Sequence, residues 1–160
     1  MHLSYFPDDL TMYQHTQRST VAVIVLTLGA LIPIALVLSG TLSPVDLGVR
    51  LTVLSAGVAM MIAAFVFSSL TIAVRDGQLS WWFGPGLVKK TVPVSTIASV
   101  EVTTTSLING WGIHLTGRGW LYNVAGRDAV LVTQRDGKRF LLGTDEPEFL
   151  AQAIRATIRR

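Results

Sequence analysis

Two long runs without a charged side chain dominate the first half of the chain. No residue is charged between Arg18 and Asp46, and none is charged between Arg50 and Arg75. Each run can supply the roughly 20 predominantly apolar residues that span a bilayer as a helix. The pattern therefore predicts two membrane helices, at about residues 20–39 and 51–73.

The segments that flank the first run indicate that the two predicted helices form a retained hairpin. Residues 1–19 carry Asp8 and Asp9 where a secretory signal has basic residues, and no clear cleavage site follows the run. The connector, residues 40–50, is too short to hold a further domain. We therefore expect an N-terminal segment over residues 1–19, followed by a transmembrane helical hairpin over residues 20–73.

Basic residues near the ends of the predicted helices indicate an orientation. Lys and Arg are enriched in the cytoplasmic loops of membrane proteins. An even number of spans places both termini on one side, and the basic residues favour that side by four to one, namely Arg18, Arg75, Lys89 and Lys90 against Arg50. We expect a multi-pass protein of the cell (inner or plasma) membrane with both termini in the cytoplasm.

From about residue 70 the pattern changes to short strands separated by turn residues. Leu70, Ile72 and Val74 alternate along one predicted strand, and Asp76-Gly77, a strong signal for a two-residue hairpin, follows them. Short strands separated by glycine-containing turns are typical of a β-sandwich or a small barrel. We expect seven or eight strands, at about residues 71–75, 78–83, 87–94, 100–104, 112–116, 120–124, 129–134 and 138–142.

The pattern at the C-terminus predicts a helix over residues 145–158. Asp145 is suited to the N-cap position, with Glu148 three residues later, and Pro147 falls in the first turn, where its missing N–H costs little. The apolar stripe of this helix consists of Leu150, Ile154 and Ile158. We expect the stripe to pack over an open end of the predicted barrel.

The order of these elements resembles the bacterial pleckstrin-homology (PH) domain family, in which the domain follows two membrane helices. The resemblance covers about residues 68–158 and is carried by the stretches FGPGLVKKTVPVSTIASVEV, GWGIHLTGRGWLYNVAG and VLVTQRDGKRFLLGTDEPEFLAQAI. It implies an α+β membrane protein whose transmembrane hairpin precedes a PH-like antiparallel β-barrel or sandwich, residues 70–160, capped by the C-terminal helix. Most members of that family have no known function, so the resemblance implies fold and placement but no reaction.

The sequence contains no recognisable catalytic, metal-binding or cofactor-binding motif. The chain has no cysteine, and His2, His15 and His114 do not have the spacing of metal ligands. No pair of carboxylates suggests a general acid and base. Half of the residues are hydrophobic and only 14% are charged, and no cluster of Lys and Arg exceeds two residues. We therefore expect no enzyme activity, cofactor, small-molecule substrate or nucleic acid partner.

Two groups of residues are candidates for interaction. Ser55, Ala59 and Ala63 share one face of the second predicted helix, a small-xxx-small ridge that allows close approach of another helix. We expect this ridge to pack on the first helix or on a second copy of the chain. Trp81 and Trp82 are adjacent and must point to opposite faces of their strand, so we expect one of them outside. The candidate interaction surface comprises Trp82, Lys89, Lys90, Lys138 and Arg139.

We therefore predict a membrane-anchored, non-enzymatic binding or scaffolding module that binds a protein partner or assembles with itself. Two alternatives remain open. In the first alternative, the chain acts through its hairpin as an accessory subunit of a larger membrane complex. In the second, it is a weak sensor of anionic lipid, which is consistent with its net charge of +3. The tight turn at residues 75–78 carries one cation, Arg75, so we expect no selective binding of phosphoinositides there.

Overall fold

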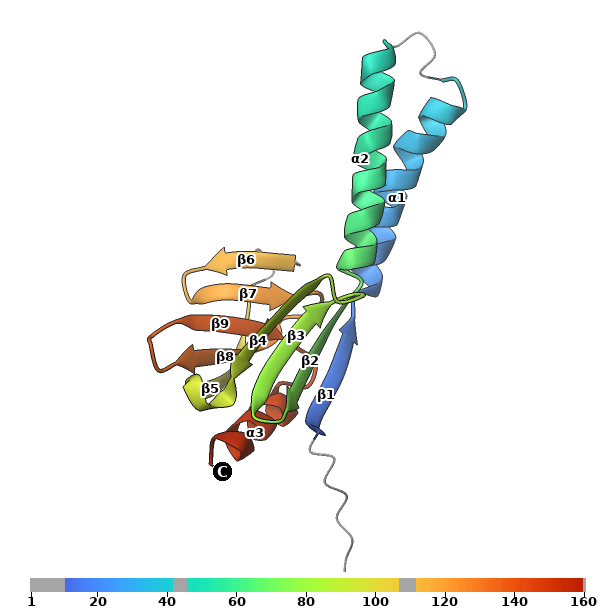
Figure 1. Ribbon diagram of the computed structural model, residues 1–160. Helices are drawn as coiled ribbons and strands as arrows, with labels where there is room; N and C mark the ends of the chain where they lie inside the picture. The colour runs from blue at the N-terminus through green and yellow to red at the C-terminus, as the bar shows by residue number, and fades with distance from the viewer. Residues whose placement is uncertain (1–10, 42–45, 107–111, 160) are drawn as a thin grey trace, which may run out of the picture.

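The computed structural model describes residues 11–41, 46–106 and 112–159. The chain is an α+β protein in which two apolar helices project from a β-sheet domain that also packs against a C-terminal helix (Figure 1). The helices are α1 (Thr20–Leu38), α2 (Leu47–Val66) and α3 (Pro147–Ile158), with a short 3-10 turn, η1 (Val94–Thr96). The strands are β1 (Thr11–Arg18), β2 (Ser69–Arg75), β3 (Gln78–Phe83), β4 (Val88–Pro93), β5 (Ile97–Thr104), β6 (Gly112–Thr116), β7 (Gly119–Asn123), β8 (Asp128–Gln134) and β9 (Arg139–Gly143).

Helices α1 and α2 lie side by side and contact each other through small residues (Figure 1). Gly57 of α2 faces Ile34 of α1 so closely that an added Cβ would lie 2.8 Å from that side chain. Ala30 of α1 is fully buried in the same contact region, while most of the larger side chains on both helices point outward. Within the described residues, these two helices are long and apolar enough to span a membrane.

Helix α2 has different ends from those that the uncharged run predicts. It begins at Leu47, where Asp46 accepts a hydrogen bond from the backbone N–H of Gly48 at 2.7 Å, and it ends at Val66. The expected range, residues 51–73, therefore extended into β2. Hydropathy does not separate the two elements, because a strand buried on both faces is as apolar as a helix.

A strand that the sequence pattern did not indicate, β1, lies before the helices. It pairs antiparallel with β2, with Gln14 opposite Ala73. The hairpin of α1 and α2 is thus inserted between two neighbouring strands of one sheet, and the backbone N–H of Ser19 donates to the carbonyl of Ser68 at 2.8 Å. The polar residues of β1 show no apolar alternation, so only its long-range pairing identifies it as a strand.

The strands form two sheets in the described residues. The first sheet has the order β1-β2-β3-β4 and is antiparallel throughout, and the second has the order β5-β8-β9-β7-β6. In the second sheet β7 and β9 are parallel, which corrects the expectation of a wholly antiparallel domain. The parallel pair arises because the β8–β9 hairpin places β9 between β8 and β7. The domain is therefore a pair of sheets, not one closed barrel.

The two sheets and α3 share one hydrophobic core. Leu70, Ile72 and Val74 of β2 are at most 2% exposed, as the alternation in the sequence predicts. Helix α3 contacts β5 and β8 of the second sheet and also β1 of the first. The core side chains of this helix are Leu150, Ala151, Ala153 and Ile154.

Candidate functional site

The β3–β4 hairpin presents two adjacent tryptophans to opposite faces of the first sheet. Trp81 is 2% exposed in the core, and Trp82 lies half-buried on the other face. Lys89, which is opposite Trp82 in the strand register, holds its Nζ 5.5 Å from the Trp82 ring centroid. The expectation that one tryptophan lies outside is therefore met by Trp82, whose outer ring face is covered by a lysine.

Lys90 lies opposite Trp81 and so projects from the same face of the sheet as that ring. Its Nζ lies 5.2 Å from the ring centroid of Tyr122 on β7, at the edge of a hollow of about 320 Å³ between β4 and the second sheet. We call this the basic hollow, because exposed Lys90, Lys138 and Arg139 line it. Its aromatic lining consists of Trp81, Trp120, Tyr122 and Phe140.

The aromatic rings of the basic hollow hold one another in place. Trp81 stacks on Phe140 with centroids 4.9 Å apart, and it meets Tyr122 edge-on at 5.2 Å. Such ring pairs add stability beyond the area that they bury. The hollow therefore has a rigid apolar lining, which suits a ligand with a flat or apolar part.

The charge of the basic hollow is positive. Lys138 forms an ion pair of 2.8 Å with Asp136 in the β8–β9 turn, which lowers the pKa of Asp136 and raises the pKa of Lys138. No carboxylate is among the described residues that line the hollow, and no ion pair involves Lys90 or Arg139 in that part of the chain. The hollow can therefore bind an anionic group next to an apolar one.

The structure divides the predicted interaction surface into two parts. Lys90, Lys138 and Arg139, which come from β4 and from the β8–β9 turn and strand, meet at the basic hollow, whereas Trp82 and Lys89 lie on the opposite face of the β3–β4 hairpin. The predicted interaction surface did not include the rings of Trp120, Tyr122 and Phe140, which the structure places beside it. Trp120 and Tyr122 share one face of β7, and the pairing of β9 with β7, which no local motif signals, places Phe140 beside them.

The small-residue ridge of α2 is not the face that contacts α1. Ser55 and Ala59 are exposed and Ala63 is half-buried, while Gly57 and Ala64 are buried. Packing of the ridge on the first helix is therefore not observed for Ser55 and Ala59. Packing on a second copy of the chain or on another membrane helix stays a prediction.

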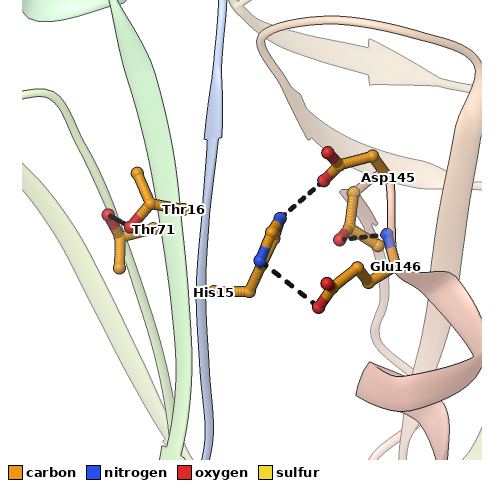
Figure 2. A network of polar contacts seen from close by, with 6 residues as sticks. His15, Thr16, Thr71, Asp145 and Glu146 are labelled. Atoms are coloured by element: carbon orange, nitrogen blue, oxygen red, sulfur yellow. Dashed lines mark hydrogen bonds and ion pairs between the residues drawn. The ribbon is translucent and has the colours of Figure 1, made fainter.

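A polar contact joins β1 to the start of α3 (Figure 2). His15 of β1 has its Nε2 2.7 Å from Oδ1 of Asp145 and its Nδ1 3.3 Å from Oε2 of Glu146. The expected N-cap role of Asp145 is wrong, because Glu146 occupies that position and Asp145 turns toward His15. Both ring nitrogens can donate to these carboxylates only when the imidazole is protonated.

Tyr13 lies on β1 two residues before His15, on the same face of the strand. Burial raises the pKa of Tyr13 to about 12, and the charges of Glu146 and Asp145 act in the same direction, whereas the Thr144 hydroxyl opposes the shift. The segment before α1 is therefore linked to the C-terminal part of the domain by a half-buried phenol and by the polar contact of His15.

The described residues contain no group of three or more His, Asp or Glu side chains placed to hold a metal ion. No protein-family model and no curated protein matches the chain. The features of the described residues that bear on function are the basic hollow, the helical hairpin and the junction between the hairpin and the domain.

Proposed function

We propose that the chain is a membrane-anchored, non-enzymatic binding module. In this proposal α1 and α2 cross the cell membrane, and the β-sheet domain is a PH-like domain, as the sequence resemblance implies, on the cytoplasmic side. The domain binds a protein partner through the basic hollow. The four-to-one distribution of basic residues supports the cytoplasmic placement.

The observation that carries the anchoring proposal is the insertion of the hairpin between β1 and β2. Ser19 alone separates β1 from α1, and residues 67 and 68 alone separate α2 from β2. Both ends of the hairpin are thus fixed to hydrogen-bonded neighbours in one sheet. This connection supports a domain held at a short, defined distance from the membrane, without a flexible linker.

The chemistry of the basic hollow supports a partner segment that carries a carboxylate next to an apolar or aromatic side chain. Lys90 and Arg139 provide charge, and Trp120, which is 48% exposed, provides an accessible ring above the buried pair of Trp81 and Phe140. Arg and aromatic residues are enriched at the central contacts of protein interfaces. The hollow of about 320 Å³ lies at the lower end of the volume range of ligand sites, which suits one or two side chains.

Purification of the full chain from membranes in a gentle detergent tests this proposal. We expect a partner protein to accompany the wild-type chain and to be lost with the double variant Lys90→Glu, Arg139→Glu. Arg159→Glu, which reverses an exposed charge directly after α3, is the matched control and is expected to retain the partner. Retention by the double variant, or equal loss with the control, contradicts the role of the basic hollow.

The exposed ridge of α2 favours a second candidate function, assembly through the hairpin. Ser55 and Ala59 leave a surface on α2 that α1 does not cover. We expect Ala59→Leu to reduce assembly in detergent, because small residues allow close helix approach, and we expect Val58→Leu on a neighbouring exposed position to leave it unchanged. Cross-linking of the two variants measures this difference, and identical behaviour removes the candidate.

A further inference from the structure

A second hollow lies where the domain meets the helical hairpin. Its volume is about 460 Å³, and it is lined by the end of β1, the first turns of α1 and the residues that lead into β2. We call it the junction hollow. Hydroxyl groups dominate its polar side, with Thr16, Ser19, Thr20, Ser68 and Ser69 among the lining residues.

The N-terminus of α1 opens into the junction hollow without a side-chain cap. Ser19 occupies the N-cap position, but its hydroxyl makes no capping hydrogen bond. The backbone N–H of Val23 donates to the carbonyl of Ser19, so the N–H groups of residues 20–22 precede the first hydrogen bond within the helix. A helix of 19 residues carries a partial positive charge at this end, which favours an anion.

The hydroxyl of Ser19 is an independent indication of a ligand. Ser19 lines the junction hollow and is only 2% exposed, yet its Oγ has no hydrogen-bond partner among the described residues. Leaving a buried polar group without a hydrogen bond destabilises the folded chain. Native structures leave few such groups, and a bound ligand that accepts from the hydroxyl is one ordinary explanation.

Charge and apolar surface specify the class of ligand. Arg18 is exposed beside the hollow and forms no ion pair among the residues described, and no carboxylate is in the described lining. Val23 and Ile24, the latter 51% exposed, form an apolar side that continues along α1. The site therefore combines features that suit a phosphate with a surface that suits the hydrocarbon attached to it.

We infer that the junction hollow binds the phosphate of a membrane phospholipid. The phosphate lies at the N-terminus of α1, between Arg18 and the Ser19 hydroxyl, and the lipid glycerol and acyl region lies against Val23 and Ile24. This inference rests on the proposed membrane anchoring, because the first turn of α1 then lies at the level of the lipid headgroups. The site differs from the basic hollow in location and in ligand.

The test uses the full chain, delipidated in a maltoside detergent, with thermal unfolding as the measurement. A short-chain phosphatidylglycerol is added in one arm, the corresponding diacylglycerol in a second and inorganic phosphate in a third. We expect saturable stabilisation by phosphatidylglycerol alone. Stabilisation by diacylglycerol of equal size overturns the phosphate contact, and equal stabilisation by inorganic phosphate overturns the assignment to a lipid.

Two variants test whether phosphatidylglycerol binds at the junction hollow. We expect Arg18→Gln and Ser19→Ala each to weaken phosphatidylglycerol binding about tenfold, the value for one lost charge-assisted hydrogen bond. Without lipid, Ser19→Ala is expected to unfold at the same temperature as the wild type or higher, because it removes an unpaired buried hydroxyl. Arg159→Gln is the control for loss of one positive charge, and wild-type affinity in both site variants contradicts the inference.

A separate measurement distinguishes failure of the inference from failure of the proposed anchoring. The wild-type chain is reconstituted into phosphatidylcholine vesicles and floated in a density gradient. A chain that floats but shows no saturable response to phosphatidylglycerol contradicts the phosphate site alone. A chain that does not float contradicts the anchoring and the inference together.

Discussion

Large apolar side chains point into the interior in the β-sheet domain and outward in the helical hairpin. In the domain, Leu142 and Ile154 are fully buried. In the hairpin, Leu31 and Ile32 are 48% and 59% exposed, and the buried positions are held by small residues such as Ala30 and Gly57. The domain therefore has the interior of a protein folded in water, and the hairpin has the surface expected of helices surrounded by lipid.

This difference separates two sources of stability. Burial of apolar surface away from water stabilises the domain. Between helices in lipid that driving force is absent, and close packing of small residues takes its place. Substitutions that are costly in one region are thus expected to be harmless in the other.

Removing a large side chain provides the strongest contrast between the regions. We expect Ile154→Ala to lower the free energy of unfolding of the full chain by about 2–5 kcal/mol, because it leaves a cavity between α3 and the sheets. Leu31→Ala, on an exposed face of α1, is expected to change it by no more than about 0.5 kcal/mol in detergent. Chemical unfolding in micelles measures both, and equal losses would contradict the contrast.

Adding a charge is expected to be more costly in the hairpin than in the domain, which is the reverse of the order for removing a large side chain. Leu28 on α1 is 53% exposed and Leu115 on β6 is 70% exposed, so lysine fits sterically at either position. A lysine near the centre of a membrane helix costs about 2.5–3.5 kcal/mol of insertion free energy. We expect Leu28→Lys to reduce the fraction of chain that resists alkaline extraction of membranes and Leu115→Lys to leave it unchanged. Equal extraction of both variants contradicts a lipid-facing α1.

The sequence predicted the features that depend on near neighbours. The Asp76-Gly77 turn has positive φ at both residues, 51° and 71°, as a two-residue hairpin requires. Leu79, Trp81 and Phe83 all face the core, in agreement with their alternation. These signals are local, because they depend on the backbone preference of a turn and on the two-residue period of a strand.

The features that the sequence did not predict depend on distant contacts. Strand β1 pairs with residues that follow the whole hairpin, so its polar sequence contains no local sign of a strand. Asp145 has the residue type of an N-cap, but it forms a hydrogen bond with His15, which is 130 positions away. The candidate interaction surface already grouped Lys90 with Arg139, but the aromatic lining that lies between them comes from both sheets and was not part of it.

The contact between β1 and α3 is expected to have a smaller effect than either substitution above. Partly exposed ion pairs contribute about 0–1 kcal/mol, and the side chains of His15 and Asp145 are 25% and 58% exposed. We expect a double-mutant cycle with His15→Ala and Asp145→Ala to give a coupling energy that is above zero and at most about 1 kcal/mol. The Asp136–Lys138 pair, whose side chains are both at least half exposed, is the control and is expected to couple less. Zero coupling for His15 and Asp145 contradicts a stabilising contact.

The last expected effect is confined to alkaline pH and concerns the titration of Tyr13. Its pKa is raised from 10.0 to about 12, so between these pH values the unfolded chain loses the phenol proton while the folded chain retains it. The stabilising contribution of neutral Tyr13 is therefore complete below pH 10.0 and is lost as the pH rises toward about 12. The tyrosinate absorbance that Tyr13→Phe removes is expected near the upper value. A difference centred near the lower value would show that Tyr13 is solvated.

The accessibility of single cysteines tests the central proposal, a membrane hairpin that carries a cytoplasmic domain, most directly. The chain has no cysteine, so Asp46→Cys and Arg159→Cys each introduce one labelling site. A membrane-impermeant thiol reagent applied to intact cells is expected to label position 46, before α2, and to leave position 159, at the end of α3, unlabelled until the cells are permeabilised. Labelling of position 159 in intact cells, with position 46 protected, would contradict the proposal.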